Sequence, residues 1–558
     1  MQGKKNYQDK RIPSFRLSER VPHDNFYRRL KEVLDLQWLY EATKKYYGSE
    51  GHKSIDAVVF FKLILIGYLE NLLSDRRIIQ TVSLRLDLLY FIGYDLNEPL
   101  PWHSTLSRTR QLLGEEVFKE FFVQVLRQCV QKGMVKGKRQ AMDSVHVKAN
   151  ASMDSLREKQ IIEDGAEYTK QLTEDDDPAS EGDGKSDDNT TVSAQKYQEV
   201  QWHHHWKDKT YKGQPGSRDE RSKFVSNHTH YSSTDPDARV AVKPGKPRQL
   251  NYLGQLSVET ASHVITHIQA DYADRKDSQC FPSLLNHTIE NLKAQELRIK
   301  EVLCDAGYSS SQALKALKEK HITGYIPNFG LYKPSRNGFR YFAGGDYYKC
   351  SQKVKLPFKK FISSHDGAYH MKEYRSSSLD CKDCPLRGKC IGKSNFKKIV
   401  DTVDKPLYDE MHQRLQTPKA KRMKKLRQST VEPVIGTLIN FLGMRRLNTR
   451  GIKLANKCML MAAVCYNLKR LLKWMGEELK NTQKMLACLH SMLWPFLLQQ
   501  ARTSLLHRLL AAESVTVNSR IKRSKNRFLN VSCATATHVV HSLSFFINSA
   551  TYPSEGGL

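Results

Sequence analysis

The sequence lacks a long uninterrupted apolar run, and no apolar stretch follows its basic start, so neither a membrane span nor a signal peptide is expected. Its 11 cysteines in 558 residues are an odd number without an export signal, which argues against a disulfide framework. It is also short of acidic residues, with 59 Asp and Glu against 89 Lys and Arg, a net charge of +30. We therefore expect a cytoplasmic protein that binds a polyanion such as nucleic acid and has no membrane partner.

The positive charge is unevenly distributed. Residues 158–188 hold 12 acidic and 3 basic residues, so we expect a flexible acidic loop over about 155–200. Arg108 and Arg110 follow a Ser/Thr-rich helix start, from which both would point outward, either into solvent or toward a DNA backbone. Basic clusters recur late in the chain, and in them we expect DNA contacts from Lys424, Lys425, Arg427, Arg445 and Arg446.

The spacing of apolar residues changes along the first 327 residues. Residues 1–137 repeat apolar residues at three- and four-residue intervals, which predicts an all-helical N-terminal domain that binds DNA. Residues 138–327 predict a strand at 139–149, a hairpin of strands at 250–259 and 263–272, a helix at 278–292, a short strand before Asp305, a helix at 312–320 and a last strand at 323–328. This order makes the last two strands parallel, so we expect a mixed five-stranded sheet with helices, an α+β or α/β fold.

The rest of the chain divides into three segments. Residues 328–418 are rich in aromatic residues, lysine and cysteine, and we expect them to form a Cys-rich insertion. Residues 419–476 return to helical spacing and should complete the sheet domain, with a helix that starts near Val431. Residues 477–558 form a C-terminal tail whose apolar residues follow no clear period.

Three carboxylates come from separate elements. Asp143 lies in the first strand, Asp305 ends the short strand, and Glu432 is expected in the first turn of the late helix. Ligand sites gather at the carboxyl ends of parallel strands, and a helix packed across the sheet would bring the glutamate there. Carboxylates that converge repel one another unless cations neutralise them, and their oxygens suit two Mg²⁺ or Mn²⁺ ions, which support in-line phosphoryl transfer. We therefore expect this triad to be catalytic.

Four cysteines form a second candidate site. Cys381, Cys384 and Cys390 have the spacing C-x₂-C-x₅-C, and Cys350 lies upstream. Such a cluster in a reducing cytoplasm binds metal more often than it forms disulfides, and four thiolates suit one structural Zn²⁺. An iron–sulfur cluster and four ordinary thiols are the alternatives.

Six segments resemble, in the same order, the DDE-type transposases of bacterial insertion sequences, in particular the IS eleven-eighty-two group of the IS-five-like assemblage. They lie within about residues 15–475 and read GYDLNEPLPWHSTLSRTR, MDSVHVKANAS, STDPDARVAVKPGKPRQLNYLGQLSVET, ADRKDSQ, EVLCDAGYSS and TVEPVIGTLINFLGMRRLNTRG. The resemblance implies an RNase H-like catalytic core in which Asp143, Asp305 and Glu432 are the DDE triad. It makes Asp277, in ADRKDSQ, a helix cap.

The resemblance also implies an activity. The enzyme would cleave double-stranded DNA at the ends of an insertion sequence with Mg²⁺ and join the freed 3′-hydroxyl to target DNA, as a homodimer associated with the bacterial nucleoid. The family has a Tyr at the position of Lys424 and a Lys at that of Ile439, whereas Arg427 keeps its basic position. These two departures leave open a catalytically inactive DNA-binding derivative, and the same core also serves nucleases and resolvases.

Overall fold

The computed structural model describes residues 16–47, 54–72, 74–160, 198–200, 227, 230–241, 247–330, 332–363, 370–478 and 480–486. The chain divides into two units, residues 1–476 and 477–558. Most of the expected acidic loop and of the expected C-terminal tail lies outside the described residues. Among the helices that are described, none is both long and apolar enough to cross a membrane.

The N-terminal part is helical, as the spacing predicts. Its helices are α1 (Leu17–Arg20), α2 (Phe26–Val33), α3 (Trp38–Thr43), η1 (Lys44–Tyr46), α4 (Ala57–Leu69), α5 (Asp75–Leu84), α6 (Leu86–Ile92), α7 (His103–Leu112) and α8 (Glu115–Gln131). Helix α4 is apolar on all sides and largely buried, and the Asp56 side chain caps it by accepting hydrogen bonds from the Val58 and Val59 amides. Helix α7 begins directly after the Pro-rich segment that predicts its start.

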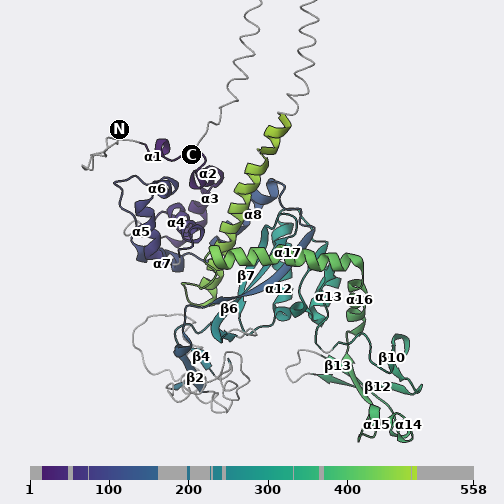
Figure 1. Cartoon of the computed structure of the whole chain (residues 1–558). Coiled ribbons are helices and arrows are strands. Elements are labelled where there is room, and N and C mark those ends of the chain that lie inside the picture. The colour runs from purple at the N-terminus through teal and green to yellow at the C-terminus, as the bar shows by residue number, and fades with distance from the viewer. Residues whose placement is uncertain are drawn as a thin grey trace, which may run out of the picture. The chain divides into compact units, whose positions relative to one another are not determined.

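A mixed sheet follows (Figure 1). Its strands are β1 (Arg139–Lys148), β5 (Arg239–Ala241), β6 (Gln249–Glu259), β7 (Ile265–Tyr272), β8 (Glu301–Leu303) and β9 (Thr323–Tyr325). Strand β6 runs antiparallel to β1 and β7, whereas β8 and β9 run parallel to β1 and to each other. The mixed order is thus confirmed, and the short β5, which pairs with the start of β6, makes the sheet six-stranded rather than five-stranded.

Helices cover both faces of this sheet, which is why β6 is buried along almost its whole length. On one face, α12 (Asp277–Lys293) and α13 (Ser311–Glu319) pack on Met142 and Val302. On the other face, α17 (Pro418–Phe441) packs on Ala141, Leu303 and Tyr325. Alternate residues of β1 therefore face different helices, as strand geometry requires.

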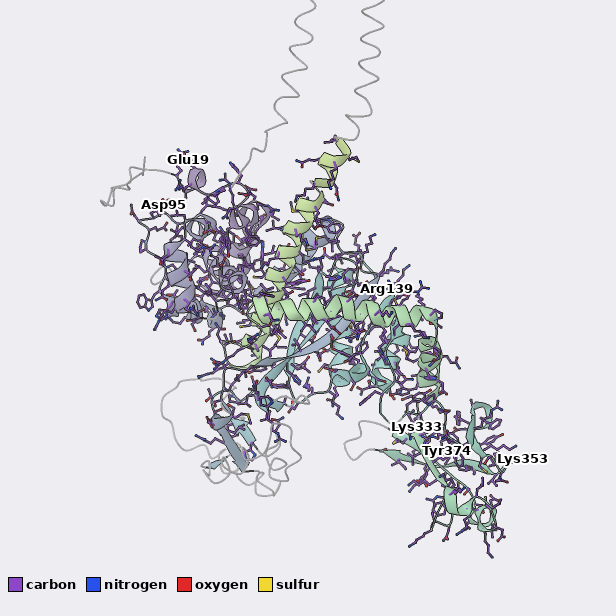
Figure 2. All side chains as sticks on the ribbon, viewed as in Figure 1. Glu19, Asp95, Arg139, Lys333, Lys353 and Tyr374 are labelled. Carbon is purple, nitrogen blue, oxygen red and sulfur yellow. The ribbon has the colours of Figure 1, made fainter. Side chains whose placement is uncertain are left out.

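A long helix that begins at residue 452 closes the exposed edge of β7. The Asn467 side chain bonds both the amide and the carbonyl of Ile265, at 2.9 and 2.8 Å, and the Asn456 side chain accepts from the Ala270 amide at 2.9 Å. Side-chain amides thus satisfy backbone groups that an edge strand would otherwise leave open. Arg139, labelled in Figure 2, lies at the start of β1, where it bonds Glu301 at 2.6 Å and joins β1 to β8.

The start of the late helix was predicted wrongly. We expect it near Val431, but α17 begins at Pro418, with the Thr417 side chain accepting a hydrogen bond from the Ala420 amide. A Thr-Pro pair is a common helix start, and the basic run that follows consists largely of strong helix formers. Glu432 therefore lies in the second half of a 24-residue helix rather than in its first turn.

Residues 339–402 form a separate five-stranded antiparallel sheet. Its strands are β10 (Phe339–Phe342), β11 (Tyr347–Cys350), β12 (Lys355–Ser363), β13 (His370–Arg375) and β14 (Lys398–Thr402), in chain order. Short helices α14 (Ser378–Lys382) and α15 (Arg387–Cys390) lie between β13 and β14, and α16 (Lys405–Leu415) leads into α17. A small core of Tyr348, Leu356, Tyr374 and Ile399 holds this sheet together. We call residues 339–402 the module.

The remaining elements are short. A third sheet contains β2 (Leu156–Gln160), β3 (Gln198–Val200) and β4 (His230–Ser232), with η2 (Met153–Ser155) before it. The turns η4 (Ala306–Tyr308) and η5 (Ala343–Gly345) follow β8 and β10.

Candidate active site

Two of the predicted carboxylates lie on neighbouring parallel strands. Ala141 of β1 pairs with Leu303 of β8, and Asp143 and Asp305 each follow two residues later. One oxygen of each carboxylate is held locally: the Ser144 amide donates to Asp143 Oδ1 at 2.8 Å, and the Gly307 amide donates to Asp305 Oδ1 at 2.9 Å. The expected placement of Asp143 on the strand beside Asp305 is therefore confirmed, with Asp143 in the middle of β1 and Asp305 just past the end of β8.

A guanidinium group lies beside these carboxylates. Arg427 Nη1 is 2.7 Å from Asp143 Oδ2, and both side chains are mostly buried, with 13% and 17% exposed. Burial raises the pKa of Asp143 and of Asp305 above their ordinary values, and the positive charge of Arg427 opposes that rise at both. In this structure an arginine from α17 thus takes the position of a counter-cation for Asp143.

Glu432 shares a cleft with Asp143. The cleft has a volume of about 520 Å³ between β1, the start of β6 and α17, and Lys148, Asn251 and Arg445 also line it. Glu432 is exposed, and it makes no hydrogen bond or ion pair with any other described residue. Its carboxylate is therefore free to bind a ligand in the cleft.

The three carboxylates border one region but do not form a closed set of ligands. Asp305 adjoins Asp143 without lining the cleft. In the part of the chain that the structure describes, no three His, Cys, Asp or Glu side chains gather closely enough to hold a metal ion. The donor chemistry suits a hard divalent cation, since three carboxylates provide oxygen ligands, but the position beside Asp143 is taken by Arg427.

Two stretches of the chain match families of transposase domains. Residues 15–112 match the family described as transposase domain (DUF772), and residues 349–472 match the family described as transposase DDE domain. Both matches support a DDE transposase of insertion sequences. The second match covers both the module cysteines and Glu432, whereas Asp143 and Asp305 lie outside both matches. Neither match names an insertion-sequence group, so the IS eleven-eighty-two assignment stays a prediction.

One solved structure similar to the transposase is a piggyBac transposase synaptic complex with hairpin DNA, determined by cryo-EM. The two chains are 8% identical with a TM-score of 0.29, and the similarity covers 81% of this chain and 79% of the other. No curated protein matches the transposase.

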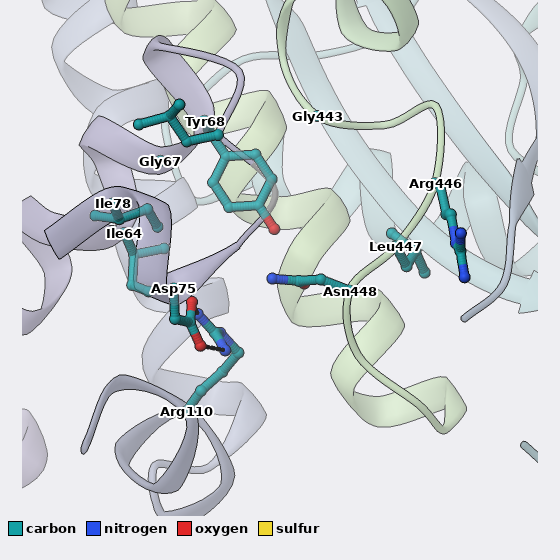
Figure 3. A pocket seen from close by; sticks show the side chains of 11 residues that line it. Ile64, Gly67, Tyr68, Asp75, Ile78, Arg110, Gly443, Arg446, Leu447 and Asn448 are labelled. Carbon is teal, nitrogen blue, oxygen red and sulfur yellow. Dashed lines mark hydrogen bonds and ion pairs between the residues drawn. The ribbon is translucent and has the colours of Figure 1, made fainter. Parts of the chain in front are cut away.

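Arg110 does not point outward, so that prediction was wrong. Its guanidinium bonds Asp75 through two contacts of 2.7 and 3.0 Å, and only 8% of its side chain is exposed (Figure 3). The ion pair lies in a small pocket between α4, α5, α7 and residues 443–448. Helical spacing explains the error, because Arg110 shares the inner face of α7 with the buried residue Leu106, four positions earlier. Arg110 thus holds α7 against α5.

The other side chains predicted to contact DNA differ in their exposure and in the residues that already bind them. Arg108 is exposed and bonds Ser104, and Lys424 and Lys425 are exposed on α17. Arg445 and Arg446 are exposed after α17, where they bond Asn440 and Asn150 at 2.9 and 3.2 Å. Arg427 is the exception, because Asp143 already binds its guanidinium.

Asp277 lies closer to the candidate site than its sequence position suggests. It is the first residue of α12, after the N-cap Lys276, and not itself the cap. A methyl group added to Gly307 would lie 3.0 Å from Asp277 Oδ2 and 3.2 Å from Asp305 Oδ1, so the two carboxylates flank that glycine. The charge of Asp277 adds to burial in raising the pKa of Asp305. The sequence gives no signal for this, because an acidic residue at a helix start is ordinary.

The predicted four-thiolate site in the module stays a prediction. Cys350, Cys381, Cys384 and Cys390 are half-buried free thiols, and no three of them form a metal-binding group. Cys381 instead lies 3.1 Å from the Ser376 hydroxyl. Cys350 ends β11, whereas the other three belong to α14, α15 and the turn between them. The four thiols therefore come from two separate parts of the module, a strand end and the α14–α15 segment.

Proposed function

We propose that this transposase cleaves DNA at the ends of an insertion sequence and joins the freed 3′-hydroxyl to target DNA. The observation that carries the proposal is the placement of Glu432 and Asp143 in one cleft, with Asp305 on the adjacent parallel strand. The strand order β7-β6-β1-β8-β9, antiparallel and then parallel, supports an RNase H-like core. The family matches at residues 15–112 and 349–472 support transposition as the activity of such a site.

Asp143, Asp305 and Glu432 are the residues that would hold Mg²⁺ or Mn²⁺ in this cleft. When bound, a divalent cation polarises the phosphoryl oxygens and stabilises charge on the attacking and leaving oxygens. The local hydrogen bonds from Ser144 and Gly307 fix one oxygen of each aspartate and so orient the other. Glu432, on a helix anchored by Val431 and Val434, would complete the set from the opposite side of the cleft.

The exposed basic residues would hold the DNA. Arg445 lines the cleft itself, while Lys424 and Lys425 project from the same helix that carries Glu432. Contacts of these side chains to phosphates would set the register of the scissile bond without reading its sequence. Two ends must be processed together in transposition, so we propose a homodimer as the working assembly.

Nicking of a supercoiled plasmid that carries the element's ends, with Mg²⁺, tests this proposal. We expect the wild-type protein to nick the plasmid and Asp305→Asn to reduce the rate by about a thousandfold, since the variant removes a charged ligand from the reacting centre. Asp346→Asn, a carboxylate that the module binds internally, is the matched control and should stay within about threefold of wild type. Equal nicking by wild type and Asp305→Asn would remove the triad from the mechanism.

An inactive DNA-binding derivative is the second candidate. It is favoured by one observation: Ile439, which stands where the family has a lysine, lines the cleft beside Glu432. DNA binding without nicking at any Mg²⁺ or Mn²⁺ concentration would support this candidate. Nicking without products joined to target DNA would instead indicate a nuclease or resolvase.

A further inference from the structure

The ion pair between Arg427 and Asp143 is well placed to control the candidate site. The two residues are 284 positions apart in the chain, and α17 brings them to 2.7 Å. Asp143 Oδ1 already accepts the Ser144 amide, so Arg427 binds Oδ2, the oxygen that remains for a ligand. The residue therefore occupies the side of the carboxylate where a divalent cation would bind.

A guanidinium and a divalent cation do not share this position. Both are positive, and at a separation of a few ångström in a mostly buried site their repulsion is strong. Binding of a cation at Asp143 therefore requires Arg427 to move. An arginine that leaves a buried carboxylate needs another anion, because an unpaired buried charge is costly.

DNA supplies that anion. A guanidinium binds a phosphate with two parallel hydrogen bonds, and arginine is well suited to exchange a carboxylate for a phosphate. Arg427 contacts Asp143, which lines the cleft, and it lies on α17 between the exposed Lys425 and the cleft residue Glu432, so a DNA strand that enters the cleft would pass close to it. The chain thus offers a route by which DNA can draw Arg427 away from Asp143.

We propose that Arg427 is the resident counter-cation of Asp143 and that a DNA phosphate displaces it, so that a divalent cation binds at Asp143 only once DNA is in the cleft. This inference rests on the proposed function, since it assumes that Asp143 is a cation ligand. Arg427 is a positioning residue in this scheme and takes no part in the chemistry. The coupling is reciprocal, because DNA must raise cation affinity by the same factor as the cation raises DNA affinity.

Mn²⁺ binding to the full-length protein, followed by the electron paramagnetic resonance of free Mn²⁺, tests the inference without measuring activity. For the wild type we expect a short DNA duplex to tighten Mn²⁺ binding by about tenfold or more. Arg427→Gln should bind Mn²⁺ tightly without DNA, and the duplex should then add less than about twofold. Arg427→Lys keeps the charge but lacks the second N–H group, so its affinity without DNA should lie between those of the other two.

Asp143→Asn is the control that separates this inference from the proposed function. If Asp143→Asn weakens Mn²⁺ binding while wild type and Arg427→Gln bind equally without DNA, the inference is overturned and the cation site stands. If no Mn²⁺ binding depends on Asp143, with or without DNA, the proposed cation site itself is overturned. Thermal unfolding of each variant without metal checks that it folds, and Arg427→Lys carries the test if Arg427→Gln does not.

Discussion

The two larger sheets of this transposase treat their buried carboxylates differently. In the module, burial alone would raise the pKa of Glu373 and of Asp346, but hydrogen bonds and nearby positive charges hold both pKa values below the ordinary range. At the candidate site of the mixed sheet, burial dominates instead, and the pKa values of Asp143 and Asp305 stay above the ordinary range. The module therefore stabilises these two negative charges, whereas the candidate site leaves Asp143 and Asp305 in need of a cation.

The two sets of carboxylates differ in pKa because their hydrogen-bond and ion-pair partners come from different parts of the chain. Asp346 is bound by Tyr341, Tyr374 and Lys372, all from strands of the same small sheet, one of them the Tyr374 labelled in Figure 2. Asp143 depends on one arginine from a distant helix, and Glu432 has no partner among the described residues. Carboxylates satisfied by their own sheet are structural, and carboxylates left under-paired around a cleft are candidates for function.

Removal of a module carboxylate should give the largest effect. Asp401 is 1% exposed, accepts from the Tyr348 hydroxyl and lies near Arg336 and Lys405. We expect Asp401→Ala to lower the free energy of unfolding by about 3–5 kcal/mol, because it leaves the Arg336 guanidinium without its carboxylate and the buried Tyr348 hydroxyl without its acceptor. Chemical denaturation measures this. A loss below about 1 kcal/mol would show that the module does not depend on its internal charges.

For the cleft we expect the opposite result, a loss of activity without a loss of stability. Glu432→Gln should reduce plasmid nicking by about a hundredfold, since a carboxylate that holds a cation is lost, while the melting temperature changes by less than about 2 °C. Glu432 is exposed and unpaired among the described residues, so its neutralisation removes no stabilising contact. The two measurements on one sample separate function from stability. A large loss of stability in this variant would remove the contrast between the sheets.

A pH titration sharpens the comparison further. His267 of β7 is buried, and burial together with the charge of His287 lowers its pKa to about 3. Its protonation is thus disfavoured in the folded state, so stability should fall as the pH drops below the unfolded pKa of about 6.5, by about 1.4 kcal/mol per pH unit. Unfolding free energies measured between about pH 6.5 and pH 4 should decline less steeply in His267→Gln. Parallel curves for the two proteins would contradict the effect of burial at this site.

The order of the elements was largely predictable because periodicity is local. Alternation over Ala141–Val147 predicts β1, and the observed core clusters place Ala141 and Met142 on opposite faces of the sheet. The sixth strand, β5, was not predicted because Arg239–Ala241 is only three residues long and has too few positions to show a period. The start of α17 was missed because its basic first half has little apolar contrast, although Thr417-Pro418 was a usable signal.

The sequence alone determined the candidate triad, the positive charge and the family, since residue types, their counts and their order along the chain need no coordinates. Only the tertiary structure decided which charges are already neutralised. In the sequence, Arg110 and Arg427 cannot be told apart from exposed basic residues such as Lys424 and Arg445. In the structure, Arg110 binds Asp75, which is 35 positions away, and Arg427 binds Asp143, which is 284 positions away. Such pairing depends on which helix faces turn inward, and long-range packing sets that orientation.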